Sequence, residues 1–170
     1  MYWNWFKLDP WFVPRYYIRD LWHPRSPLSS TTLVHRAFFS PSFPVEKVKE
    51  FEKGMPEYES MLFPLGMMFP FVNIRRVLGN IVGWNRPNQS RLLVIAGERD
   101  KLMGVSLMQK MAALYRNAMV DFFAPEKLPL KDVDGGLVTF EVVGGSGHHI
   151  QNDLYWEDGA GKILKFLEQL

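Results

Sequence analysis

The stretch "VTFEVVGGSGHH", residues 138–149, decides the fold, because an apolar run of strand length passes here into a glycine-rich turn with two histidines. A second such run, "RLLVIAG" at residues 91–97, leads directly to Asp100. Between the two runs, "VSLMQKMAALYRNAM" at residues 105–119 has apolar side chains at helical spacing, and "GKILKFLEQL" at residues 161–170 repeats that spacing. The order strand, helix, strand, helix predicts an α/β fold with parallel strands, a right-handed crossover and helices packed over the sheet.

Both helices are expected to turn an apolar face toward the sheet. The side chains expected on these faces are Leu107, Met111, Leu114 and Ala118 in the first helix and Ile163, Leu164 and Leu167 in the second. Two parallel strands alone do not form a stable sheet, because parallel sheets are normally covered on both faces and open edges pair readily. We therefore expect further strands from the N-terminal half, from a segment outside this chain or from a partner chain.

Composition places the chain among globular proteins and excludes several functions. The 170 residues are 47% apolar and 15% aromatic, which is typical of one compact unit. The net charge of +2 comes from interspersed acids and bases, so neither a nucleic-acid-binding stripe nor a strong membrane signal is expected. Cysteine is absent, which excludes disulfides, thiolate nucleophiles and cysteine metal sites. Lys7, Asp9 and Pro10 interrupt the apolar start, so we read no export signal and take the cytoplasm as the default location.

Residues 1–90 differ from residues 91–170 in being rich in Trp, Phe, Met and Pro. Short helices are predicted in "PVEKVKEFEKGM" at residues 44–55, in part of residues 56–69 and in part of residues 72–82. The apolar face of the first of these helices comprises Val45, Val48, Phe51 and Met55. We expect a mainly helical segment here, followed by the β-α-β-α part of the fold.

The ends of the two predicted strands carry an aspartate and a histidine, a pair suited to acid–base catalysis. Asp100 follows the first strand, and His148 follows the second. In open α/β sheets the ligand-binding residues lie beyond the carboxyl ends of the strands, so neighbouring strands would bring the two together. A carboxylate that accepts from one imidazole nitrogen orients the ring and prepares the other nitrogen to act as a general base.

Several stretches resemble the α/β-hydrolase family. "LLVIAGERDKLM" at residues 92–103 and "FEVVGGSGHHIQND" at residues 140–153 resemble its last two strands and the loops after them. "LVHRAFFS" at residues 33–40 and "YESMLFPLGMMFPFVNIRRVLGNIVGW" at residues 58–84 resemble the lid of fungal members. The resemblance implies that residues 1–90 form a lid or cap-like segment and residues 91–170 the C-terminal part of the hydrolase core. It makes Asp100 the catalytic acid and His148, which directly follows a glycine, the catalytic histidine in preference to His149.

The nucleophile of such a hydrolase is not recognisable in this sequence. The family places it in a G-x-S-x-G turn upstream of the acid, whereas Ser146 lies in "GGSGH" beside the histidine and Ser106 lies in "GVSLM". We expect the nucleophile upstream of residue 1 or on a partner chain, and the chain alone to be nearly inactive. The resemblance implies hydrolysis of an ester or related bond in a small apolar substrate, or of an epoxide with an aspartate nucleophile, and it implies no cofactor.

Simpler interpretations stay open for each of these residues. Asp100 is also suited to cap the helix that begins near Gly104, and an isolated loop histidine is more often structural than catalytic. Adjacent histidines diverge, so no metal site is predicted at His148 and His149. We assign structural roles to the remaining polar candidates. Gln151, Asn152 and Asp153 are expected to cap a short helix after the histidines, with a role in holding the histidine loop as the second interpretation. His23 and His35 are expected to be structural histidines.

Two alternatives to an active enzyme stay open. One is a non-catalytic binding module, an inactive truncated fragment or pseudo-enzyme subunit that binds a partner through its open sheet edge and aromatic N-terminal surface, which the absent nucleophile turn favours. The other is a peripheral membrane protein, which rests on the aromatic start alone. For the hydrolase, the segment "MLFPLGMMFPF" at residues 61–71 suggests an apolar substrate pocket under a lid, with Met67, Met68 and Phe69 lining it.

Overall fold

The computed structural model describes residues 2–11, 14–19, 21, 30–55, 72–82, 92–123 and 138–170. Within them the chain is a mixed α/β structure in which a two-stranded parallel sheet packs against helices. The α-helices are α1 (Tyr2–Leu8), α3 (Thr31–Phe38), α4 (Val45–Lys53), α6 (Ile74–Val82), α7 (Val105–Phe123) and α8 (Trp156–Leu167), joined by a π-helical turn η1 (Arg15–Arg19) and a 3-10 turn η4 (Ile150–Asn152). None of the helices in these ranges is long and apolar enough to cross a membrane.

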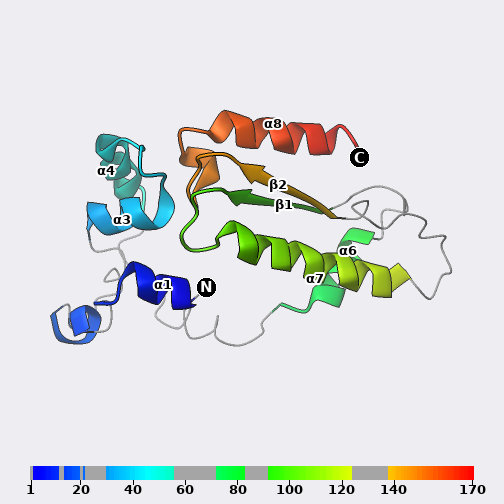
Figure 1. Ribbon diagram of the computed structural model, residues 1–170, viewed down its shortest axis with the longest axis horizontal. Helices are drawn as coiled ribbons and strands as arrows, with labels where there is room; N and C mark the ends of the chain where they lie inside the picture. Colours follow the sequence, from blue (N-terminus) through cyan, green and yellow to red (C-terminus); the bar gives the residue numbers. More distant parts are fainter. Residues whose placement is uncertain are drawn as a thin grey trace.

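The two predicted strands are confirmed as β1 (Leu92–Gly97) and β2 (Val138–Val143). They pair in parallel, with Leu92 opposite Val138 and Gly97 opposite Val143. The carboxyl ends of both strands therefore lie side by side, and Figure 1 shows them pointing toward α3 and α4. The loops that leave these ends are the ones that carry Asp100 and His148.

The sheet is the middle layer of three, with α7 against one face and α8 against the other (Figure 1). α6, which lies in the range predicted for a helix at residues 72–82, packs against α7. The buried side chains between these elements are Leu78, Val94, Ala112, Met119 and Val138. Each Leu, Val or Met side chain among them contributes about 1.5–3 kcal/mol when it is fully removed from water, so this cluster fixes the helices on the sheet.

The expected inward face of α8 is wrong. Ile163, Leu164 and Leu167 are 44%, 58% and 54% exposed. The helix instead turns Gly159 toward η4 and the end of β2, where an added Cβ would lie 2.8 Å from Cγ2 of Ile150 and 3.6 Å from Cγ2 of Val143. A close approach at this glycine sets the rotation of the helix and leaves its more apolar stripe outward.

The expected face of α7 is wrong at one position, because Leu114 is 58% exposed. Leu107, Met111 and Ala118 are partly buried. The fully buried positions are Ala112 and Met119, one residue away from the predicted stripe. The helix is therefore rotated slightly from the orientation that its apolar spacing favours.

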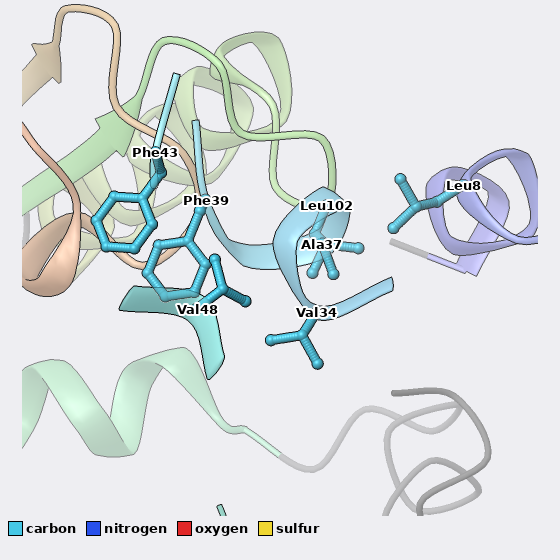
Figure 2. Close-up of a cluster of buried hydrophobic side chains, with 7 residues drawn as sticks. All are labelled: Leu8, Val34, Ala37, Phe39, Phe43, Val48 and Leu102. Carbon is cyan, nitrogen blue, oxygen red and sulfur yellow. The ribbon is translucent and has the colours of Figure 1, made fainter. Parts of the chain in front are cut away.

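A second core joins the N-terminal helices to the loop after β1. Figure 2 shows its buried side chains, which are Leu8, Val34, Ala37, Phe39, Phe43, Val48 and Leu102. Because Leu102 belongs to the loop of Asp100, this cluster anchors α1, α3 and α4 beside the carboxyl edge of the sheet.

The predicted helix over residues 44–55 is α4. Val48 is fully buried, and Phe51 and Met55 pack against the core around it, whereas Val45 is 44% exposed and so does not belong to the inward face as expected. Val45 is the first residue of the helix, where the chain enters from solvent. The helix predicted within residues 56–69 lies outside the described residues.

Candidate functional site

The loops that follow β1 and β2 are joined by their backbones. The amide of Glu98 donates to the carbonyl of Val143 at 3.0 Å, and the amide of Arg99 donates to the carbonyl of Ser146 at 2.8 Å. A third bond runs from the amide of Gly145 to the Glu98 carboxylate, also at 2.8 Å. The pairing of the strands thus continues past the sheet, and the two loops form one structural unit.

Asp100 and His148 meet within this unit. Nδ1 of His148 lies 2.8 Å from Oδ2 of Asp100, and the side chains are 32% and 5% exposed, respectively. The other carboxylate oxygen, Oδ1, accepts the amides of Leu102 and Met103, each at 2.8 Å. Both oxygens of Asp100 are therefore occupied, so the loop backbone holds the carboxylate in the orientation that the histidine requires.

The ring of His148 is held from a second side by Phe38, the last residue of α3. The two rings stack with centroids 5.9 Å apart and planes at 22°. An ionised carboxylate only accepts hydrogen bonds, so the proton of a neutral His148 lies on Nδ1, and Nε2 carries the lone pair. Among the described residues Nε2 has no hydrogen-bond partner. The arrangement leaves a basic nitrogen ready to take a proton.

His149 occupies a different environment from its neighbour. Its ring lies among Phe38, Phe39 and Phe51, with the Phe51 ring centroid 4.8 Å away, and the Asn152 amide donates to its Nδ1 at 3.0 Å. Burial lowers the pKa of His149, and the nearby His148 lowers it further. Of the two histidines only His148 is bonded to Asp100, and His149 packs into the aromatic cluster.

Asp153 has a larger structural role than its sequence context indicates. Its side chain is buried, and its two oxygens accept four hydrogen bonds. Oδ1 accepts the Ser40 hydroxyl at 2.8 Å and the Leu154 amide at 2.7 Å, and Oδ2 accepts the amides of Ser40 and Gly147, each at 2.8 Å. The sequence predicts only a cap role for Asp153, shared with Gln151 and Asn152, or a role in holding the histidine loop, and no local signal identifies Ser40, which is far away in the sequence.

The other predicted residues are not assembled at the site. Ser146 is buried, and its hydroxyl donates to the carbonyl of Gly147 at 3.5 Å, while Ser106 is exposed on the first turn of α7. His35 on α3 donates from Nε2 to the carbonyl of Ser40 at 3.1 Å, as expected of a structural histidine. In the described ranges no group of three or more His, Cys, Asp or Glu side chains is arranged to hold a metal ion. The predictions for His23 and for the lid residues Met67, Met68 and Phe69 lie outside the described residues.

Comparisons with models of known protein families, with curated proteins and with solved structures find no significant match to this chain. The geometry of the site therefore carries the functional argument. It consists of a buried carboxylate, a histidine that the carboxylate and a phenylalanine ring orient, and a backbone framework that joins the two strand ends.

Proposed function

We propose that this chain supplies the acid and the histidine of an α/β-hydrolase-type site, and that its active form hydrolyses an ester or a related bond in a small apolar substrate. The observation that carries the proposal is the 2.8 Å contact between His148 and Asp100 beyond the carboxyl ends of adjacent parallel strands. The position of α3 and α4 beside that edge supports the assignment of residues 1–90 as a lid and residues 91–170 as part of the core (Figure 1).

In this proposal His148 is a general base. Its Nε2 takes the proton of a nucleophilic hydroxyl as the oxygen attacks the carbonyl carbon, and the imidazolium later returns the proton to the leaving alcohol. Asp100 stabilises the imidazolium and fixes the tautomer that leaves Nε2 unprotonated. With an aspartate nucleophile, as in an epoxide hydrolase, the same histidine activates the water that cleaves the covalent intermediate.

The nucleophile comes from a segment or partner chain outside these 170 residues. Neither serine considered from the sequence is suited to the role, because Ser146 is buried against its own loop and Ser106 lies exposed on α7. The preference for an apolar substrate rests on the Met- and Phe-rich stretch at residues 61–71. No cofactor is needed for either reaction.

A second candidate is a binding module without catalysis. It is favoured by the two hydrogen bonds from the Leu102 and Met103 amides to Asp100, which give this carboxylate a structural use in the turn. In that case the contact with His148 stabilises the loop and no proton transfer takes place.

Hydrolysis by the native assembly distinguishes the two. The tagged chain is purified under native conditions from the cells that make it and assayed with short and long p-nitrophenyl esters, with styrene oxide and with a fluorophosphonate probe. We expect turnover that falls about 10³- to 10⁴-fold in Asp100→Asn, because an amide that donates to the ring stabilises the wrong tautomer. Glu98→Gln, an acid substitution in the same turn, serves as the matched control and retains turnover.

A serine nucleophile adds fluorophosphonate labelling, whereas an aspartate nucleophile gives epoxide hydrolysis without labelling. Absence of turnover on every substrate, or turnover that Asp100→Asn leaves intact, would overturn the hydrolase proposal and support the binding module.

A further inference from the structure

We propose that Asp153 and Ser40 act as a positioning pair that holds the His148 ring in place against Asp100. This inference rests on the proposed function for what the ring does. The geometry it concerns is independent of the nucleophile and of the substrate.

The first step is the hydrogen bonding of the buried carboxylate. Asp153 is 2% exposed, and each of its oxygens accepts two hydrogen bonds from uncharged donors at 2.7–2.8 Å. A buried carboxylate is costly unless its oxygens are fully hydrogen-bonded. Ser40 and the loop of Gly147 must therefore stay close to Asp153, since displacement of either would leave this charge unsatisfied.

The second step is what those donors connect. Ser40 lies two residues after Phe38, whose ring stacks on His148 and whose carbonyl accepts the amide of His149 at 2.8 Å. Gly147 directly precedes His148. By binding Ser40 and Gly147 through the same oxygen, Asp153 ties the segment that carries the stacking ring to the loop that carries the histidine.

The third step is that Asp100 and His148 are held in place by different contacts. Asp100 is fixed by the amides of its own turn, independently of Asp153. The position of the His148 ring depends on the loop at Gly147 and on Phe38, and Asp153 bonds Gly147 directly and reaches the segment of Phe38 through Ser40. Loss of Asp153 is therefore expected to release the histidine while the acid stays in place.

Substitutions at Asp153 have graded consequences. Asp153→Ala removes all four hydrogen bonds. In Asp153→Asn, we expect the side-chain nitrogen to replace Oδ1. The nitrogen can then donate to the Ser40 hydroxyl oxygen, and only the Leu154 amide loses its hydrogen-bond acceptor. The bridge from Ser40 to Gly147 survives in that orientation. Ser40→Ala removes one bond and retains the one from the Ser40 amide.

The test is the protonation and exchange of the His148 imidazole, measured by ¹H–¹⁵N NMR on the full chain with ¹⁵N-labelled histidine at a pH where the ring is neutral. The wild-type chain is expected to give a single Nδ1–H tautomer with a slowly exchanging proton. Asp153→Ala is expected to give mixed tautomers and loss of the slowly exchanging Nδ1 proton, with Ser40→Ala and Asp153→Asn intermediate. Asp158→Ala, a matched removal of an exposed aspartate on α8, leaves the His148 signals unchanged.

The outcomes separate this inference from the proposed function. A folded Asp153→Ala that keeps the wild-type His148 tautomer and exchange rate overturns the positioning role and leaves the proposed function standing. If Asp153→Ala does not fold, Ser40→Ala decides, and an unchanged His148 signal in that variant overturns the inference. A wild-type chain in which His148 already shows mixed tautomers, unaffected by Asp100→Asn, contradicts the pairing on which the proposed function depends.

Discussion

The loop after β2 and the outer face of α8 are close in sequence but differ in how their residues are constrained. In this loop, Gly147, His148 and Asp153 each contact residues from elsewhere in the chain, and Gly147 and Asp153 are buried. On α8, Leu164 and Leu167 are more than half exposed although the helix packs on the sheet. The difference shows that hydrogen bonds with specific partners fix the positions of polar residues in the loop. An apolar stripe on a helix can pack against any apolar surface, so the stripe alone does not determine which way the helix faces.

Among the variants that test this difference, the largest loss of stability is expected for Gly147→Ala. A Cβ at this position would lie 2.5 Å from the backbone carbon of Phe39, so the loop or the end of α3 must move. We expect Gly147→Ala to lower the free energy of unfolding by about 3 kcal/mol, as for an overpacked core position. Gly144→Ala is the matched control in the same loop, because an added Cβ there meets no atom within 4 Å. Urea denaturation of the two variants gives the comparison, and equal midpoints would show that the loop is not tightly packed.

The sequence predicts the features of this structure that depend on short stretches of the chain, and it does not predict those that depend on contacts between residues far apart in sequence. The strands, α7 and the meeting of Asp100 with His148 follow from local runs and from the rule that parallel strands end at one edge. The bonds between Asp153 and Ser40 were missed, because no local pattern relates residues that far apart in sequence. The rotation of α8 was missed because it depends on the contact of Gly159 with Ile150, which the spacing of Ile163, Leu164 and Leu167 does not reveal.

A smaller effect on stability is expected from the titration of His149, which lies in the loop after β2. Its pKa in the folded chain is lowered by burial and by His148, so the unfolded chain binds the proton more readily. The contribution of His149 to the free energy of unfolding should therefore be constant above pH 6.5, the ordinary histidine pKa. Below pH 6.5 the free energy of unfolding should decrease as the pH falls toward the lowered pKa of the folded chain. Thermal unfolding at a series of pH values measures it. His149→Gln should reduce the slope, and an unchanged slope in this variant would assign the dependence to other groups.

The smallest effect is expected on the outer face of α8. Leu164→Ala should change the free energy of unfolding by less than about 0.5 kcal/mol, because the side chain is 58% exposed. Leu78→Ala is the buried counterpart, with a side chain that is fully buried, and should lower it by about 3 kcal/mol. Equal losses in the two variants would mean that the face of α8 is covered in solution, and the comparison between the two regions would then fail.

The most direct test of the proposed function compares the adjacent histidines in the hydrolysis assay of the native assembly. Only His148 contacts Asp100, and His149 packs among phenylalanine rings. We predict that His148→Gln lowers kcat/KM by at least about 10⁴-fold, a loss no smaller than that of Asp100→Asn, because the base itself is removed, while His149→Gln retains turnover within about tenfold. Equal turnover in the wild type and His148→Gln, or a larger loss in His149→Gln than in His148→Gln, would contradict it.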